Sequence, residues 1–165
     1  TMCDLMFVAE DAIIGYPPVR AMTPVDVLYH PWQMHQKKVR ELLYTGDSVT
    51  GKEAVEIGWA NRAVPVDQLC KVTEAFAERI ANIDSPMLQM TKRQVNRAYE
   101  IMGMRTSMQV GADIQELGRA RPGGGTFGRM SREKGLKAAL DWRDSPFEDY
   151  ASAPAGSPKP SGATW

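Results

Sequence analysis

This 165-residue sequence is poor in cysteine, has no excess of charge of either sign and contains no long apolar run. Its two cysteines, Cys3 and Cys70, are too few for a disulfide framework or a metal cluster, so we expect buried thiols and no metal. Twenty basic residues balance twenty acidic ones, which leaves no field to attract nucleic acid or an anionic membrane. With no apolar stretch of about 18 residues and no signal peptide, we expect a cytoplasmic location and leave mitochondria and other organelles open.

The most informative stretch of the sequence runs from residue 39 to residue 66. Apolar residues recur at helical spacing at its start, and Gly46 ends that helix because glycine enters the left-handed conformation readily. Thr50 then begins a short second helix, and Glu53, three residues later, completes a capping box. Residues 59–64 read as a strand. The stretch therefore predicts a helix, a turn, a short helix and a strand in succession.

Short strands and helices are predicted for the rest of the chain. Ser85 and Pro86 are expected as the N-cap and first residue of a long helix that Gly103 kinks. The other expected elements are strands at 4–9 and 12–14, a loop at 15–24, a helix from 67 with an apolar stripe of Leu69, Val72, Phe76 and Ile80, and a flexible linker at 121–128. The small, proline-rich residues 151–165 predict disorder.

Four segments of the chain share an ordered pattern with a known family. They are MCDLMFVAEDAIIGYPPVR (2–20), VRELLYTGDSVTGKEAVEIGWANRAVPV (39–66), SPMLQMTKRQVNRA (85–98) and REKGLKAALDWRDSPF (132–147). Together they resemble the crotonase superfamily, the enoyl-CoA hydratases and isomerases, from Met2 to about Phe147.

The resemblance implies an α/β crotonase fold, a spiral of ββα units followed by helices. Residues 1–64 would be the end of the spiral core with a pocket-lining segment, residues 65–147 the helical trimerisation region, and residues 148–165 a disordered tail. Thr1 falls in the middle of the family's pattern, so we expect either a C-terminal piece of a longer protein or a chain that lacks the N-terminal half.

The family's chemistry depends on groups that this sequence only partly contains. Two backbone N–H groups hold a thioester carbonyl and stabilise the enolate, and the resemblance places both upstream of Thr1. The hydratases also use two glutamates as general acid and base. One lies upstream again, and Pro18 occupies the position of the other. Because proline has no titratable group, we do not expect the standard two-glutamate hydration.

Asp26 is the candidate for the missing proton-handling group. It lies eight residues after Pro18, a spacing at which some family members that shift double bonds place a catalytic aspartate. Its apolar neighbours could desolvate the carboxylate, and His30, four residues on, could face it from a helical turn. The alternatives stay open: Asp26 could instead cap a short helix after Pro24, and His30 could be structural.

Pocket and coenzyme contacts are predicted from the same comparison. The expected substrate-pocket residues are Tyr16, Pro18, Met22, Tyr29, His30 and Trp32. Tyr29 and Trp32 stand where the family often has small residues, so their rings either reshape the acyl pocket or pack in the core. Lys137 and Arg143 match basic positions of the terminal motif and are the candidates for binding coenzyme A.

The sequence thus predicts an acyl-CoA enzyme that works through a thioester enolate, by isomerisation, atypical hydration or hydrolysis of a carbon–carbon bond. Coenzyme A would be part of the substrate, with no other cofactor, and the chain would assemble as a trimer or a dimer of trimers. Two alternatives remain: a non-catalytic acyl-CoA-binding or scaffold protein of the same fold, and an assembly fragment with no ligand.

Overall fold

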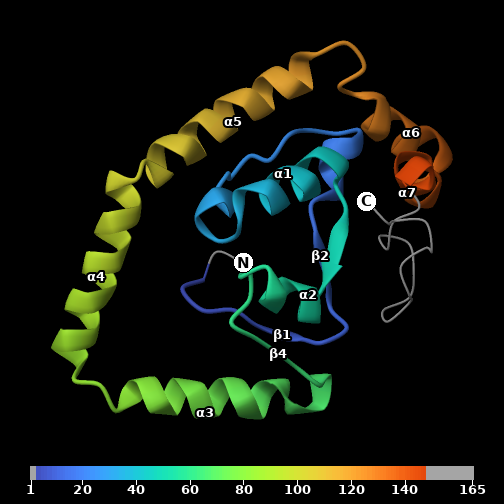
Figure 1. Cartoon of the computed structure of the whole chain (residues 1–165). Helices are drawn as coiled ribbons and strands as arrows, with labels where there is room; N and C mark the ends of the chain where they lie inside the picture. The colour runs from blue at the N-terminus through green and yellow to red at the C-terminus, as the bar shows by residue number, and fades with distance from the viewer. Residues whose placement is uncertain (1–2, 148–165) are drawn as a thin grey trace.

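The computed structural model describes residues 3–147, which form a mixed core, a long helical arm and a C-terminal helix pair (Figure 1). The strands are β1 (Phe7–Ala9), β2 (Ile13–Gly15), β3 (Ser48–Thr50) and β4 (Arg62–Val64). The α-helices are α1 (Gln36–Thr45), α2 (Gly51–Glu56), α3 (Leu69–Ala81), α4 (Ser85–Ile101), α5 (Met104–Ala120), α6 (Thr126–Lys134) and α7 (Leu136–Asp144). Short 3₁₀ turns are η1 (Pro17–Arg20), η2 (His30–Trp32), η3 (Val66–Gln68) and η4 (Ser145–Phe147).

The core contains two small two-stranded sheets. β1 pairs in parallel with β4, and β2 pairs antiparallel with β3. The chain passes between these strands so closely that a side chain does not fit: a Cβ added at Gly51 would collide with the carbonyl oxygen of Ala9, and one at Gly15 would lie 2.5 Å from Ser48 Oγ. Two glycines therefore allow the sheets and α2 to pack together.

The local signals between residues 39 and 66 are confirmed. Gly46 ends α1 with φ 72°, and its N–H donates to the Leu42 carbonyl at 2.8 Å. Thr50 and Glu53 form both hydrogen bonds of the capping box. The strand β3 was not predicted, because its three residues form a strand only through pairing with β2. The N-cap of α4 is Asp84 and not Ser85, which is already the first helical residue.

The hydrophobic core lies where α1, α2 and the strands meet. Val49 is 1% exposed and Ala54 0%, so these two side chains are sealed by their neighbours. The buried cluster consists of Val8, Met34, Val39, Leu42, Val49, Ala54, Trp59 and Ala60. Burial of this apolar surface is the main source of the core's stability.

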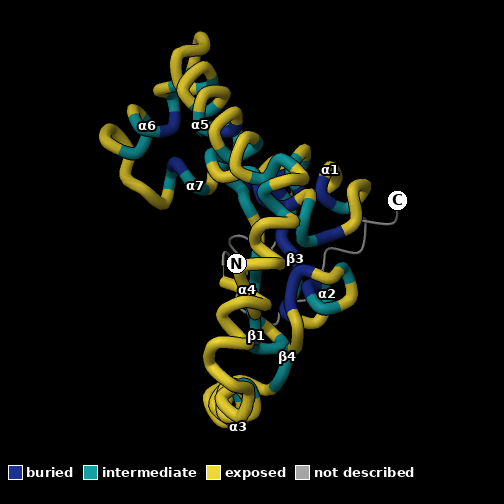
Figure 2. The backbone as a smooth tube through the Cα atoms, turned by 90° about the vertical axis from the view of Figure 1, so that its left-hand side faces the viewer, coloured by how far each residue is buried: buried dark blue, intermediate teal, exposed yellow. Residues whose placement is uncertain are grey.

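The arm consists of α3, α4 and α5, which border the core on three sides (Figure 1). α3 packs on the first sheet through the predicted stripe, and its Phe76 ring lies 5.1 Å from the Phe7 ring. α4 has no buried residue, and its tube is almost entirely exposed in Figure 2. Gly103, with φ 88°, separates α4 from α5, so the expected kink is a break between two helices.

The last helices return to the start of the chain. α6 and α7 pack against each other, and α7 contacts η1. The linker predicted at 121–128 is shorter than expected, because α6 begins at Thr126 and buries Phe127. The disorder predicted for the tail falls on residues 148–165, which lie outside the described residues.

The composition raised expectations about the cysteines, about metal binding and about membrane spans. Cys3 and Cys70 are both exposed, so the expectation of buried thiols is wrong: Cys70 lies outside the apolar stripe of α3. Within residues 3–147, no group of three or more histidine, cysteine or acidic side chains is placed to hold a metal ion. No helix in that range is both long enough and apolar enough to cross a bilayer.

Candidate functional site

The candidate site is built on the segment between β2 and α1. This segment contains the 3₁₀ turns η1 and η2 joined by irregular backbone, and it carries all seven residues predicted from sequence as pocket or proton-handling groups. α5 holds it from outside: Ser107 Oγ donates to the Leu28 carbonyl at 3.3 Å. Arg121 donates to the carbonyls of Ala21 and Met22 at 3.2 and 3.0 Å.

Asp26 lies in the irregular part of this segment. Neither helical interpretation of it holds, because residues 26–29 are not helical and η2 begins only at His30. The carboxylate instead accepts the backbone N–H of Val27 at 2.8 Å. α5 approaches the backbone so closely that a Cβ on Gly111 would lie 2.7 Å from the Asp26 carbonyl oxygen. Asp26 is therefore held in place by its main chain.

Tyr16 interacts with Asp26 through charge and through a backbone hydrogen bond. Burial and the negative charge of Asp26 raise the pKa of the Tyr16 phenol, while a backbone hydrogen bond from Asp26 and the positive charge of Arg119 oppose the rise. The phenol stays protonated at neutral pH and can donate a hydrogen bond. The structure thus brings together two of the predicted residues, one from the end of β2 and one from the segment before η2.

A small cavity lies beneath Tyr16. Its volume is about 10 Å³, and its walls are Gly15, Tyr16, His30, Met34, Val39, Leu42, Leu43 and Trp59. His30 is only 5% exposed and stacks on Tyr29, with ring centroids 4.4 Å apart. Trp59 meets His30 edge-on at 5.6 Å. Burial lowers the pKa of His30, so its imidazole is neutral at pH 7.

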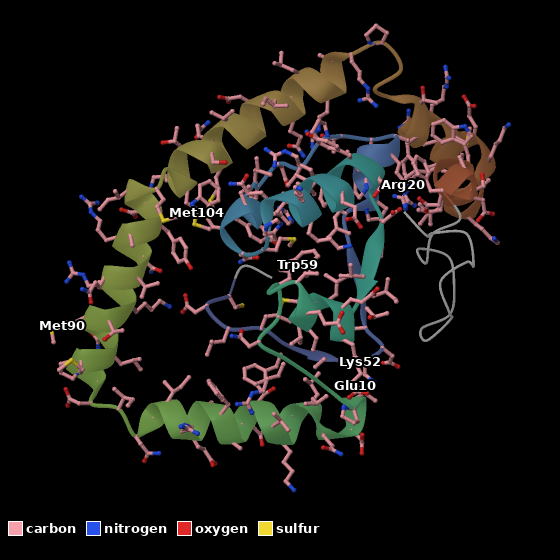
Figure 3. The ribbon with its side chains drawn as sticks, in the orientation of Figure 1. Glu10, Arg20, Lys52, Trp59, Met90 and Met104 are labelled. Atoms are coloured by element: carbon pink, nitrogen blue, oxygen red, sulfur yellow. The ribbon has the colours of Figure 1, made fainter. Side chains whose placement is uncertain are left out.

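Two buried ring nitrogens in this region lack a hydrogen-bond partner within residues 3–147: His30 Nδ1 and Trp59 Nε1. Figure 3 shows Trp59 between α1 and α2, and its side chain is part of the cavity wall. Sequence reasoning missed Trp59 as a site residue and treated it only as the start of a strand. Its position directly after Gly58, which has φ 81°, is the one signal that it turns inward.

The other predicted pocket residues are dispersed. Pro18 lies in η1, and its carbonyl accepts the N–H groups of Met22 and Thr23 at 2.8 and 3.1 Å. Tyr29 is buried at 6% exposure and packs in the core, while Trp32 is half-buried at the end of η2. Met22 does not line the cavity; its sulfur instead accepts a contact from the Arg143 guanidinium at 3.9 Å. Of the six predicted pocket residues, only Tyr16 and His30 line the cavity.

Arg143, a candidate for binding coenzyme A, is part of a buried ion cluster. It is 8% exposed and donates two hydrogen bonds to Asp144, at 2.8 and 2.7 Å. Arg20 also donates to Asp144 at 3.1 Å and to Asp47 at 3.0 Å, and its guanidinium lies 4.4 Å from the Phe147 ring. Burial acts to raise the pKa of Asp144, but hydrogen bonds from Arg143 and Arg20 outweigh it and hold the pKa below its usual range.

Lys137, the second candidate for coenzyme binding, lies on the outer face of α7. Its side chain is 88% exposed and forms an ion pair with Asp141 at 2.9 Å. An exposed ion pair of this kind opens at little cost, so the ammonium can reach an anionic group in solution. Of the two candidates for coenzyme binding, Lys137 is therefore exposed and Arg143 is buried. Arg20, which sequence reasoning did not single out, connects the cluster by pairing with both Asp47 and Asp144 (Figure 3).

Comparison with known proteins identifies the family. The family model for enoyl-CoA hydratase/isomerase matches residues 1–149. A similar protein named enoyl-CoA hydratase EchA13, from Mycobacterium tuberculosis, is 32% identical over 149 residues, which cover 87% of this chain and 46% of that protein. A hydroxycinnamoyl-CoA hydratase-lyase from Pseudomonas fluorescens is 27% identical over 142 residues, covering 84% of this chain and 49% of the relative.

The fold is similar to solved structures of the same family. The crystal structure of an enoyl-CoA hydratase from Mycobacterium smegmatis superimposes with a TM-score of 0.83 at 34% identity, covering 87% of this chain and 49% of that one. The chain thus spans about half the length of the relatives it matches. The crotonase fold expected from the sequence is confirmed, and this chain belongs to the enoyl-CoA hydratase/isomerase family.

Proposed function

We propose that this protein acts on acyl-CoA thioesters through an oxyanion-stabilised enolate, by isomerisation, atypical hydration or hydrolysis of a carbon–carbon bond. The observation that carries the proposal is the family match over residues 1–149. Coenzyme A belongs to the substrate, and no other cofactor takes part in the proposed reaction. By the family resemblance, the donors that stabilise the enolate would belong to a segment ahead of the pattern that begins at Met2.

Asp26 is the residue we propose to move the proton. Pro18 stands where the family's second glutamate is expected, and proline cannot exchange a proton. Asp26 supports the role through its position: α5 fixes its backbone, and its charge acts on Tyr16 at the mouth of the cavity. A fixed carboxylate next to a partly buried phenol is an arrangement that suits general acid–base chemistry.

The test is the Asp26→Asn variant, made in a version of the protein that includes the N-terminal half. A panel of acyl-CoA thioesters first identifies a substrate, and turnover of that substrate is then compared. We expect kcat to fall by about 100-fold or more, the usual contribution of a positioned general acid or base. Asp67→Asn, at an exposed position in η3, is the matched control and should keep wild-type turnover. Wild-type turnover in Asp26→Asn would overturn the assignment.

A non-catalytic acyl-CoA-binding protein is the second candidate function. It is favoured by Pro18, because a proline at the position of the family's second glutamate cannot exchange a proton. Calorimetric titration with acetyl-CoA separates the two functions. Binding without turnover of any thioester in the panel would support this candidate, whereas turnover would exclude it.

We also propose that the protein assembles as a trimer or a dimer of trimers through its arm. Large apolar side chains are exposed along α4 and α5: Met87, Leu88, Met90, Val95, Ile101, Met102, Val110, Ile114 and Leu117. Apolar surface of this extent marks an interaction face, and a partner subunit would cover it. Light scattering of the purified protein should give a mass of three or six subunits, and a monomer would contradict the proposal.

A further inference from the structure

The starting point is the pair of buried nitrogens at the cavity beneath Tyr16. Among the described residues, neither His30 Nδ1 nor Trp59 Nε1 has a hydrogen-bond partner. The two side chains are 5% and 8% exposed, so bulk water does not reach them freely. Buried polar atoms of folded proteins are nearly always satisfied by protein or by an ordered water, since an unmet bond costs the full desolvation of the group. Two such atoms around one cavity require a common explanation.

The walls of the cavity show why no neighbouring side chain supplies the partner. Apart from the three rings, the wall side chains are the hydrocarbon and thioether groups of Met34, Val39, Leu42 and Leu43. The volume, about 10 Å³, is close to the smallest space that holds one water. Purely apolar cavities stay empty, whereas a cavity of this size can hold one ordered water when polar atoms in its wall supply hydrogen bonds.

We propose that this cavity holds one oxygen atom, of water or hydroxyl type, that hydrogen-bonds both His30 Nδ1 and Trp59 Nε1. The ring centroids of His30 and Trp59 are 5.6 Å apart. One oxygen that makes two hydrogen bonds of about 2.9 Å joins two nitrogens up to about 5.8 Å apart, and these two nitrogens lie on rings that meet edge to face. The volume has room for one oxygen atom, so only the terminal oxygen of a larger ligand would enter it.

The chemistry of the two rings sets the direction of both bonds. An indole N–H can only donate, so the oxygen accepts from Trp59. In the proposed arrangement the oxygen donates its own proton to His30 Nδ1, which is then the unprotonated nitrogen of a neutral imidazole with its proton on Nε2. Burial keeps the pKa of His30 low, in agreement with that neutral state.

Two sources can supply the oxygen. Water fills the site in the unliganded protein. Under the proposed acyl-CoA function, on which this second source rests, the hydroxyl group of a hydroxyacyl chain could replace the water, because Tyr16 both lines the cavity and lies next to Asp26. The site would then distinguish hydroxylated acyl chains from plain ones.

The experiment is NMR of the purified protein labelled with ¹⁵N at histidine and tryptophan. We expect a cross-relaxation signal between water and the Trp59 indole proton, and an imidazole of His30 with unprotonated Nδ1 and protonated Nε2. Trp59→Phe keeps an aromatic ring but removes the donor, and it should change the Nδ1 signal of His30. Trp142→Phe, at a 42% exposed position, is the control and should not.

The outcomes separate this inference from the proposed function. Loss of the water signal on adding 3-hydroxybutyryl-CoA, but not butyryl-CoA, would identify the substrate hydroxyl as a second occupant; persistence with both would leave water as the occupant. Neither result depends on turnover. A proton on Nδ1 of His30 together with no water contact at Trp59 would overturn the inference, as would a crystal structure with a protein group on both nitrogens.

Discussion

The core and the arm of this protein use apolar residues in different ways. In the core, Val49 and Ala54 are sealed by neighbours from the same chain. In the arm, Leu88 and Val95 of α4 recur at helical spacing like core residues, yet they are 38% and 48% exposed, and Leu117 of α5 is 72% exposed. The amphipathic pattern is therefore the same, but only the core satisfies it within residues 3–147. The difference indicates that the apolar residues of the arm are suited to packing against a surface that residues 3–147 do not provide.

The largest expected effect comes from breaking the buried ion cluster. Replacing Arg20 by alanine leaves Asp144 with one of its two arginine partners and removes the ring contact with Phe147. Loss of a partner that leaves a buried charge unpaired typically costs about 3–5 kcal/mol, and because Asp144 keeps Arg143 we expect the lower end of that range. Arg97→Ala in the arm breaks only an exposed pair with Glu100 and should leave the free energy of unfolding nearly unchanged. Urea unfolding of both variants measures the contrast, and equal losses would refute it.

A cavity-forming pair tests the apolar contrast directly. Leu42→Ala removes a side chain that is 6% exposed in the core, and we expect a loss of about 2–5 kcal/mol in the free energy of unfolding. Leu117→Ala in the arm should change it by about 0.5 kcal/mol or less when the protein is monomeric. Repeating the urea titration over a range of protein concentrations sharpens the comparison. If a partner covers the arm, the cost of Leu117→Ala will grow as the assembly becomes the dominant species.

A smaller effect is expected from the capping box of α2. Thr50→Ala removes the hydroxyl that accepts the N–H of Glu53 at 3.2 Å, and such a loss costs about 1 kcal/mol. Asp84→Ala removes the equivalent acceptor at the start of α4, where Met87 donates at 3.3 Å. We expect Asp84→Ala to cost the same or less, since the exposed end of α4 can exchange its lost bond for water. A larger cost at α4 would show that this helix is more tightly held than its exposure indicates.

The pH dependence gives the mildest contrast. Burial lowers the pKa of His30 in the folded protein, so the unfolded chain takes up the proton first as the pH falls below about 6.5. The His30 contribution to stability is therefore complete above that pH and decreases between the unfolded pKa and the lower folded one. Asp144 acts in a second window, because its lowered pKa contributes stability that is lost only as the pH falls below about 3.9.

Thermal unfolding between pH 7 and pH 5 measures the histidine effect. His30→Phe should reduce the slope of the melting temperature against pH, because it removes the buried titrating group. His35→Gln, at the exposed N-cap of α1, is the control for histidine removal. An unchanged slope in His30→Phe would show that another group is responsible for the acid sensitivity.

Local signals explain what could be predicted from the sequence. Gly46 and the pair Thr50–Glu53 were assigned correctly, because a helix end depends on a few neighbouring residues. The family pattern gave the fold, since its segments keep their order along most of the chain. The segment before η2 was misjudged, because nothing in the residues from Pro24 to His30 reports that α5 lies against it. That packing, and not helix propensity, determines the backbone at Asp26.

Long-range partners explain what could not be predicted. Arg20 and Asp144 are 124 positions apart, so no spacing rule connects them. Arg143 was assigned to coenzyme binding from its position in the terminal motif, whereas its guanidinium lies in the buried cluster. The two exposed cysteines were misjudged for the same reason: burial depends on what covers a residue, and the sequence around it does not reveal the cover.

The ion pair between Arg20 and Asp144 also joins two distant points of the polypeptide and so closes one large loop, which contains the whole arm. The entropy lost in closing so long a loop grows only slowly with its length, so insertions in the arm should be tolerated well. Continuity of the backbone matters far more. A single cut in the exposed α4 would turn α5, α6 and α7 into a separate chain, and Arg20 would then compete for Asp144 at the concentration of that fragment in solution instead of the much higher effective concentration of a tethered partner.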